Sequence, residues 1–265
     1  MLRSIKDITS YPVEALDGHI GTVKDCLFDD HFWTWRHLVV DTENWLPGRK
    51  VLVSPLHLQQ PEVGMSVHHF PINLTKSQIE ACPDLAADEP VSRRHETELA
   101  RYYKHAPYWL VSDIFEPGRP ERFDDFYDEH SVKQKLEHME KLKEIEACHL
   151  QSAKEVFGYH IDAKENEFGY LDDLIVEDQT WKILFMVVVA HKWLPGRKFL
   201  IDIDWVLHFD WQNKSATVRL SREEIESSPV YGPHQPINHD YLGKLYDYYG
   251  LPQRKDKSSM GKTTF

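Results

Sequence analysis

The chain contains the same six residues twice. Trp-Leu-Pro-Gly-Arg-Lys occupies residues 45–50 and returns unchanged at residues 193–198, an offset of 148 residues. The offset holds without a gap from Leu2 to Leu58 and falls to 146 for the matches that end at Pro83 and Pro229. An internal repeat of this length constrains the fold more than any other feature, because both copies should form the same structural unit.

The matches outside the hexapeptide define the extent of the two copies. They pair Leu2, Ser4, Lys6, Gly21, Asp25, Asp30 and Trp33 with Leu150, Ser152, Lys154, Gly169, Asp173, Asp178 and Trp181, and the weaker final match pairs Tyr102-Tyr103 with Tyr248-Tyr249. We therefore predict copy one at 1–84, then a Tyr-rich helix, a Pro/Gly loop and a charged connector helix at 85–148. Copy two follows at 149–230, and a Tyr-rich helix with a polar tail at 231–265.

Hydrophobic periodicity predicts mainly β-structure within each copy. Residues 21–29 alternate apolar and polar side chains, and residues 36–42 are rich in β-branched residues, as strands are. Short helices are predicted at 75–81 and 221–227, each beginning at a Ser or Thr with Gln or Glu three residues later, the pattern of a capping box. The sequence thus predicts two small antiparallel β-barrels in tandem, joined by a helical connector that includes residues 130–147.

The hexapeptide itself predicts a turn between two strands. Proline presets φ at the first central position and glycine supplies positive φ at the second, which is typical of a type II turn. The candidate structural or interaction residues of the repeat are Trp45, Pro47, Gly48, Arg49 and Lys50 with their counterparts Trp193, Pro195, Gly196, Arg197 and Lys198. The basic pairs could bind an acidic partner or phosphate, or they could pair with the acidic turns at 29–30 and 177–178. The tryptophans could be exposed anchors or packing residues.

The second copy has a strand that is apolar on both faces. Residues 184–190 read Leu-Phe-Met-Val-Val-Val-Ala, whereas copy one has Arg36 and His37 at the corresponding places. One barrel can bury only one face of a strand, so the face that carries Phe185 or the face that carries Met186 needs another cover. We expect that cover within the chain, with a second copy of the chain as the alternative.

Composition narrows the classes of partner. The chain has 265 residues, a formal net charge of −12 and a pI near 5.7, which disfavours binding to nucleic acids and to anionic lipid. Its 3 cysteines are widely spaced and predict reduced thiols. The apolar run at 183–190 is too short for a membrane span, and the N-terminus lacks an apolar signal segment. A cytoplasmic location is expected.

Catalytic motifs are not evident in the sequence. Gly-x-Ser-x-Gly, Gly-x-Gly-x-x-Gly and His-Glu-x-x-His do not occur. The 16 histidines are scattered without the spacing of a metal site. We therefore expect neither a cofactor nor a metal, and a protein that is not an enzyme.

Two copies of this strand and turn pattern resemble the PRC-barrel family. The resemblance is carried by Leu38-Val39-Val40-Asp41, by Asn-Trp-Leu-Pro-Gly-Arg-Lys-Val-Leu-Val-Ser-Pro at 44–55 and by Ser-Ala-Lys-Glu-Val-Phe-Gly-Tyr-His-Ile at 152–161. The whole chain is similar to tandem PRC-barrel proteins of bacterial type. The family's barrel also occurs in the cytoplasmic part of the photosynthetic reaction-centre H subunit and in the ribosome-maturation factor RimM. Copy two departs from the pattern with Asp202-Ile203 in place of Ser54-Pro55 and with Val189 in place of Asp41.

The resemblance implies a small barrel used for docking rather than for catalysis. The favoured function is a non-enzymatic scaffold or regulatory protein that binds an unidentified protein partner, which could be a second copy of the chain. Two alternatives stay open: an accessory factor for photosynthetic or electron-transfer complexes or stress responses, which rests on kinship alone, and a ligand sensor or enzyme with a pocket between the barrels.

Overall fold

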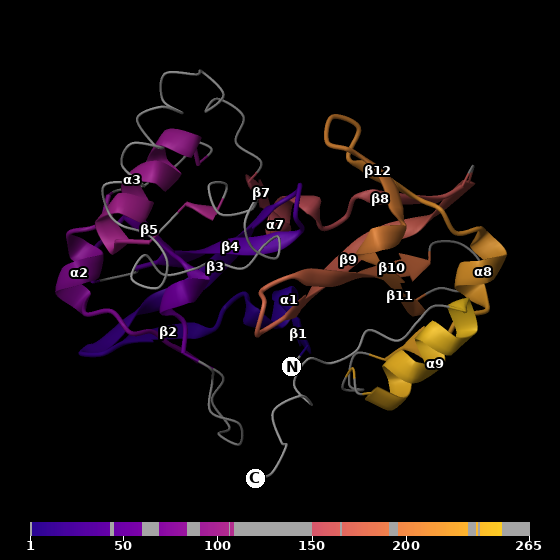
Figure 1. Cartoon of the computed structure of the whole chain (residues 1–265), viewed down its shortest axis with the longest axis horizontal. Helices are drawn as coiled ribbons and strands as arrows, with labels where there is room; N and C mark the ends of the chain where they lie inside the picture. The colour runs from indigo at the N-terminus through magenta and orange to yellow at the C-terminus, as the bar shows by residue number, and fades with distance from the viewer. Residues whose placement is uncertain are drawn as a thin grey trace, which may run out of the picture. The chain divides into compact units, whose positions relative to one another are not determined.

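The computed structural model describes residues 2–42, 45–59, 69–83, 91–105, 107–108, 150–164, 166–190, 196–232, 237 and 239–250. In these ranges the protein is mainly β-structure, with strands in two sheets and short helices between them (Figure 1). The mainly β class predicted from the sequence is confirmed. The predicted connector helix at 130–147 lies outside the described residues.

The first copy forms a sheet whose central strands follow one another along the chain. Its elements are β1 (Leu2–Ser4), α1 (Ile5–Ile8), β2 (Pro12–Ala15), β3 (Gly18–Asp29), β4 (Thr34–Asp41), β5 (Lys50–Val53), η1 (Pro55–His57), β6 (Phe70–Pro71), α2 (Lys76–Glu80) and α3 (Arg93–Tyr103). The strand order is β5-β4-β3-β2-β6, in which β2 to β5 are antiparallel and β6 runs parallel to β2. The core of this sheet is therefore an antiparallel meander.

The second copy repeats this order and extends it. Its elements are β7 (Leu150–Ser152), α7 (Ala153–Val156), β8 (His160–Ala163), β9 (Asn166–Glu177), β10 (Ile183–Ala190), β11 (Lys198–Asp202), η3 (Ile203–Trp205), β12 (Val206–Asp210), β13 (Ser215–Val218), α8 (Arg222–Glu226), β14 (Val230–Tyr231) and α9 (His239–Tyr249). The strand order is β12-β13-β8-β9-β10-β11-β14. The sequence did not single out β12 as a strand.

The connection from β11 to β12 shows that this second sheet is curled. The two strands stand near opposite ends of the order, yet only η3 joins them. The four steps from Asp202 to Val206 span at most roughly 15 Å, whereas the six strands from β12 to β11 side by side would be about 24 Å wide. The sheet must therefore bend toward itself. Within the described residues neither sheet closes into a barrel.

One glycine in each copy allows the strands to bend closely over one another. A Cβ on Gly21 would lie 1.9 Å from the carbonyl oxygen of Asp41, and one on Gly169 would lie 1.9 Å from that of Val189. Only a residue without a side chain fits there. The repeat of these two glycines in the sequence thus has a steric cause.

Both predicted capping boxes are present. Thr75 and Gln78 exchange side-chain and backbone hydrogen bonds at the start of α2, and Ser221 and Glu224 do the same at the start of α8. These bonds satisfy amide groups that the first helical turn leaves without partners. The predictions at 75–81 and 221–227 are confirmed.

Each copy contributes its first strand to the sheet of the other copy. β1 pairs antiparallel with β9, with Leu2 opposite Glu177, and β7 pairs antiparallel with β3, with Leu150 opposite Asp29. The offset of 148 residues maps one pairing onto the other, so the copies exchange strands as the subunits of a two-fold symmetric dimer can. The sequence did not predict this exchange.

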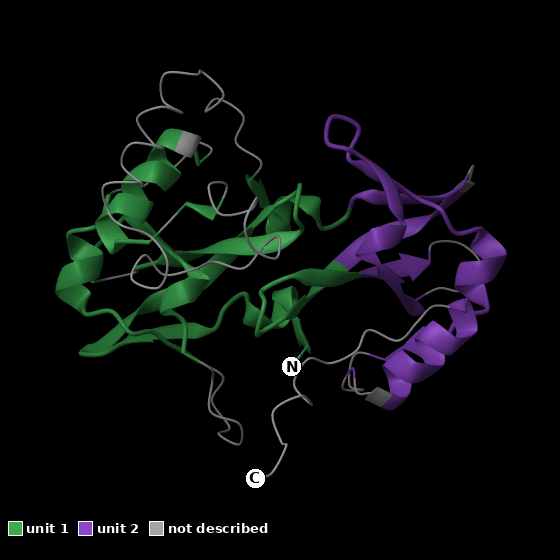
Figure 2. Ribbon diagram, in the orientation of Figure 1, with its two compact units in different colours: residues 1–158, 173–185 green, residues 159–172, 186–265 purple. Residues whose placement is uncertain are grey.

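Contacts divide the chain into two compact units (Figure 2). Unit 1 comprises residues 1–158 and 173–185, and unit 2 comprises residues 159–172 and 186–265. Both exchanged strand pairs lie in unit 1, which is why this unit includes part of the second copy. The units are defined by contacts and the copies by sequence, so the copy boundaries at 84 and 149 stay a prediction.

Helix α3 covers one face of the first sheet. Leu99 on α3 packs in a buried cluster with Val39 on β4 and Leu52 on β5, and Figure 1 shows the helix lying along these strands. The Tyr102 hydroxyl donates to the carbonyl of Gln78, and its counterpart Tyr248 donates to that of Glu224. Through these bonds Tyr102 holds α3 to α2, and Tyr248 holds α9 to α8.

The two-faced burial predicted for the apolar strand is also found. Phe185 and Met186 are both fully buried in the single chain, and along β10 only Leu184 is half-buried. The same holds for β4, where Arg36 and His37 are buried as well. Both faces are therefore covered within the chain, as expected, and a second copy is not needed for that purpose.

Candidate functional site

The hexapeptide of the first copy forms the predicted turn. The Arg49 amide donates to the Leu46 carbonyl at 3.0 Å, and Gly48 has a φ of 77°. Gly196 has a φ of 78°, while Trp193 and Pro195 lie outside the described residues. Pro47 is exposed and Trp45 is half-buried, with the Lys76 ammonium 5.5 Å from its ring centre. The turn is thus formed by its backbone conformation and by local side-chain packing.

The basic residues of the hexapeptide do not bind as the sequence led us to expect. The Arg49 guanidinium donates at 2.6 Å to the carbonyls of Glu80 and Cys82, at the end of α2. The Lys198 ammonium binds Asp172 at 2.6 Å, so its predicted pairing with the acidic turn at 177–178 is wrong. Carbonyls at a helix C-terminus attract positive charge, which the sequence pattern alone could not reveal. Lys50 is half-buried, and Arg197 is exposed.

The acidic turns have other arginines as partners. Asp178 binds Arg3 at 3.0 Å, and Asp29 lies 3.5 Å from Arg36. Both arginines come from segments that the sequence analysis did not associate with these turns. The predicted partners of the acidic turns are therefore corrected.

Two tryptophans of the repeat join the copies. Trp33 and Trp181 have φ values of 52° and 58°, a conformation that bulky residues rarely adopt. The Trp181 carbonyl accepts from the Trp35 amide at 2.8 Å, and the Trp33 carbonyl accepts from the Ile183 amide at 2.7 Å. Trp181 is buried, and its ring meets that of Trp35 edge to face at 5.0 Å. Trp33 and Trp181 thus act in packing between the copies.

A matching pair of carboxylates, Asp173 buried and Asp25 half-buried, lies beside the exchanged strands. Asp173 accepts hydrogen bonds from the Ser4 hydroxyl and the Lys6 amide. Its counterpart Asp25 accepts from the Ser152 hydroxyl at 2.6 Å and the Lys154 amide at 3.1 Å. Burial raises the pKa of Asp173 to about 6 against the opposing effect of these hydrogen bonds, and it also raises the pKa of Asp25.

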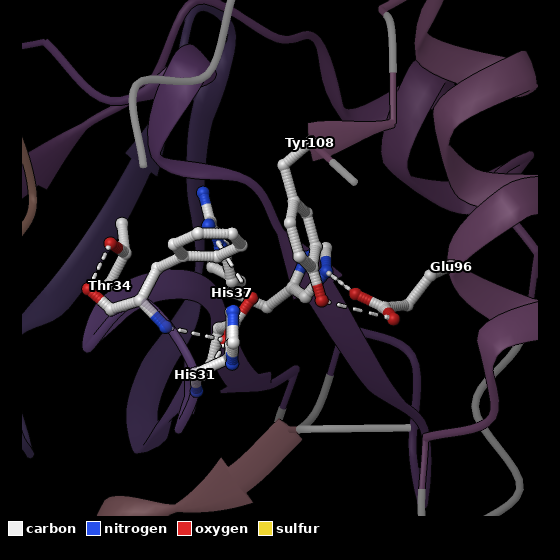
Figure 3. Close-up of polar contacts among 8 residues, drawn as sticks. His31, Thr34, His37, Glu96 and Tyr108 are labelled. Carbon is white, nitrogen blue, oxygen red and sulfur yellow. Dashed lines mark hydrogen bonds and ion pairs between the residues drawn. The ribbon is translucent and has the colours of Figure 1, made fainter. Parts of the chain in front are cut away.

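One group of charged side chains occurs in the first copy without a counterpart in the second. We call Asp29, Arg36, His37, Glu96 and Tyr108 the copy-one polar cluster (Figure 3). Arg36, Asp29 and Glu96 are 4%, 2% and 2% exposed. Burying charges is costly unless they are paired, so each of these charged side chains needs a partner within the fold.

Strands β3 and β4 supply the first half of the cluster. Asp29 at the end of β3 accepts from the amides of His31 and Phe32 at 2.8 and 3.1 Å, which fixes the turn, and faces the Arg36 guanidinium with its other oxygen. The guanidinium lies 3.8 Å from the ring centre of Tyr108, a cation–π contact. Burial lowers the pKa of Arg36, and the nearby Asp29 carboxylate opposes that effect.

Helix α3 and the residues after it supply the second half. The Glu96 carboxylate lies 3.3 Å from His37 Nε2 and accepts from the Tyr108 hydroxyl at 3.5 Å, as Figure 3 shows. His37 belongs to β4, and its backbone carbonyl accepts from the Trp35 indole at 2.8 Å. The cluster therefore ties α3 to the face of the sheet through polar contacts.

The cluster borders a small cavity. Its volume is about 30 Å³, and Arg36, His37, Ser54, Leu56, Glu96 and Tyr108 are among the residues that line it. A cavity measured in this way needs roughly 10–15 Å³ to hold one water molecule. The cavity thus fits one or two water-sized groups, and we take it with the polar cluster as the candidate functional site.

The sequence placed no functional site here. It noted Arg36 and His37 only as polar residues on a strand that is apolar in copy two, and Glu96 and Tyr108 were not singled out. The one signal in the sequence was that contrast with Leu184 and Phe185. Among the described residues no cluster of three or more His, Cys, Asp or Glu side chains is arranged to hold a metal ion.

No protein-family model matches the chain, and no curated protein matches it. None of the described helices is both long enough and apolar enough to cross a membrane.

Proposed function

We propose that this protein is a non-enzymatic interaction protein of PRC-barrel type, acting as a scaffold or regulatory module. The repeated hexapeptide turn, the antiparallel meander and the curled second sheet support a tandem barrel-like architecture. The cytoplasmic location expected from the sequence belongs to the same proposal.

The observation that carries the proposal is how the copy-one polar cluster is used. Its charges pair with one another and hold α3 on the sheet: Glu96 bonds His37 on β4, and Leu99 packs in the apolar cluster beneath the helix. The opposite face of α3 exposes Arg94, Glu98 and Arg101. A rigidly positioned, charged helix face is suited to recognising another protein, because preorganised charges give specificity and steer association.

Affinity capture from the native host tests this role. The immobilised wild-type chain should retain a specific protein, and a variant with Arg94→Glu and Arg101→Glu should lose it. Lys244→Glu on α9, the corresponding helix of copy two, is the matched control and should still capture the partner. Capture that is equal for all three proteins, or no specific capture by the wild type, would contradict the proposal.

The alternative of an accessory role in photosynthetic or electron-transfer complexes, or in stress responses, rests on the family resemblance alone and stays a prediction. The neighbouring genes in the native host test it: pigment, electron-transfer or stress genes would favour it.

A further inference from the structure

One segment of copy one docks on copy two through specific polar contacts. Residues 2–8 comprise β1 and α1, and we call them the copy-one arm. The strand of the arm pairs with residues 175–177 of β9, and the Arg3 guanidinium binds the buried Asp178 carboxylate at 3.0 Å. The buried Asp173 accepts two further hydrogen bonds from the arm. The arm and these docking residues belong to the same compact unit.

The arm also carries apolar residues that are covered in the fold. Ile5 and Ile8 on α1 are fully buried, and so are Ala153 and Val156 at the corresponding places of α7. The arm therefore combines apolar anchors with its own set of polar partners. Segments of this kind are what identical chains exchange in domain-swapped dimers, because a second molecule offers the same docking site.

The residue that connects the arm to β2 has a strained backbone. Ser10 has a φ of 95°, a region that residues with a side chain rarely adopt. Its counterpart is Gly158, whose similar φ of 91° carries no such penalty. Straightening the chain at Ser10 would release the strain at the expense of the hydrogen bond from the Tyr11 amide to the Ile8 carbonyl. Strain in a short hinge favours domain swapping.

We propose that the copy-one arm also docks on a second copy of this chain, so that two molecules exchange their arms and form a dimer. The contacts of Arg3 with Asp178 and of Ser4 with Asp173 then recur between the molecules, and the hinge alone changes. In the monomer the arm meets its own site at an effective concentration on the order of 1 mM. The dimer therefore accumulates as the protein concentration approaches that value. The proposal does not depend on the scaffold role proposed above.

Two charge-reversed variants of the full-length protein test the exchange. In Arg3→Asp the arm places a carboxylate opposite Asp178, and in Asp178→Arg the site places a guanidinium opposite Arg3. Each variant thus repels its own arm and the arm of an identical molecule, whereas after mixing every arm finds an opposite charge on the other variant. We expect a heterodimer in the mixture at micromolar concentrations by light scattering, and monomers in each variant alone. The double variant restores the pair within one chain and should behave as the wild type does.

An ion pair outside the arm provides the matched control. Lys198 binds Asp172 at 2.6 Å, so mixing Lys198→Asp with Asp172→Lys should give no heterodimer. A heterodimer from this control pair would show that any complementary charges join these chains, which overturns the proposal. The proposal is also overturned if Arg3→Asp and Asp178→Arg stay monomeric after mixing while the double variant folds.

A disulfide cross-link that leaves Arg3 and Asp178 in place decides the matter even if a charge-reversed variant does not fold. Leu2 lies opposite Glu177 in the pairing of β1 with β9, so Leu2→Cys with Glu177→Cys can join the arm to its site within one chain or between two. The share of covalent dimer should rise with protein concentration, as mass action requires. Ser10→Gly removes the strain of the hinge and should lower that share several-fold, while Leu2→Cys alone controls for the native cysteines. Cross-links confined to single chains at every concentration would overturn the proposal.

Discussion

The two copies differ in chemistry at the positions where α3 packs on the first sheet. Where the helix of copy one meets β4, the buried residues include Arg36, His37 and Glu96, whereas copy two has Leu184, Phe185 and Leu242 at these positions. Phe185 is fully buried, and Leu184 and Leu242 are half-buried, so the second copy forms its strand without buried charges at these positions. Buried charges often add little to stability compared with apolar residues of similar size, so their presence in one copy points to a role other than stability.

The contacts that join the two copies are, in contrast, alike in both copies. The exchanged strands, the Ser–Asp hydrogen bonds and the tryptophan carbonyls all recur at an offset of 148 residues. The parts that join the copies are therefore symmetric, while the cluster beneath α3 is not.

The strongest test of equivalence is the glycine at the strand bend. Gly21→Ala and Gly169→Ala should each destabilise the protein by roughly 4 kcal/mol or more, because the new methyl would lie 1.9 Å from a backbone oxygen. Gly158→Ala is the control, since a Cβ there has no atom within 4 Å and is opposed only by the positive φ of 91°, so it should cost roughly 1–3 kcal/mol. Soluble yield and urea unfolding measure the effect. If only one of the two variants is severely destabilised, the copies are less alike than these contacts indicate.

The second test concerns the copy-one polar cluster. Asp29→Asn should cost about 3 kcal/mol, because it removes the charge of the carboxylate that faces the buried Arg36 guanidinium. The matching change in copy two, Glu177→Gln, should cost less than about 1 kcal/mol, since that half-buried side chain accepts mainly a local bond from Thr180. Urea unfolding of both variants gives the two values. Equal costs would show that the Asp29–Arg36 pair contributes no more to stability than the local contacts of Glu177.

Several of these features could be predicted from the sequence and others could not. The repeat, the β class, the capping boxes and the turn at Gly48 depend on residues close together in the chain, where spacing carries the information. The exchange of the strands Leu2–Ser4 and Leu150–Ser152 could not be predicted, because a strand of three residues is too short to show a hydrophobic period. Tyr108 reaches Arg36 and Glu96 only through tertiary packing. The candidate site was therefore missed, although its contrast between copies was visible in the sequence.

The third test asks how far the two carboxylates beside the exchanged strands are alike. Burial raises the pKa of Asp173 to about 6, above its value of about 3.9 in an unfolded chain. The neutral form is thus favoured by folding, so the associated stability is fully present below about pH 4 and is lost as the pH rises to about 6. At neutral pH the ionised group costs on the order of 3 kcal/mol relative to its neutral form.

Unfolding of the wild type and of Asp173→Asn across this pH range measures the difference. The stability of the variant relative to the wild type should rise by about 2–3 kcal/mol from pH 4 to pH 7, because Asn keeps an acceptor oxygen and does not ionise. Asp25→Asn should show a change of the same sign, since burial raises the pKa of Asp25 as well. Parallel pH profiles for wild type and Asp173→Asn would contradict the assigned pKa.

The smallest expected effect belongs to the feature that is most alike in sequence. Gly48 and Gly196 have φ values of 77° and 78°, and a Cβ at either position would meet no atom within 4 Å. A substitution there is opposed by backbone strain alone, and strain of this kind costs about 1–3 kcal/mol for a β-branched residue. We expect Gly48→Val and Gly196→Val each to cost about 1 kcal/mol or slightly more. Thermal melts of both variants should show similar, modest decreases, while Gly48→Asn and Gly196→Asn should lie closer to the wild type because Asn tolerates positive φ. An unchanged midpoint in Gly48→Val would mean that the turn does not require positive φ, and a much larger loss in one copy would mean that its hexapeptide makes contacts that the other lacks.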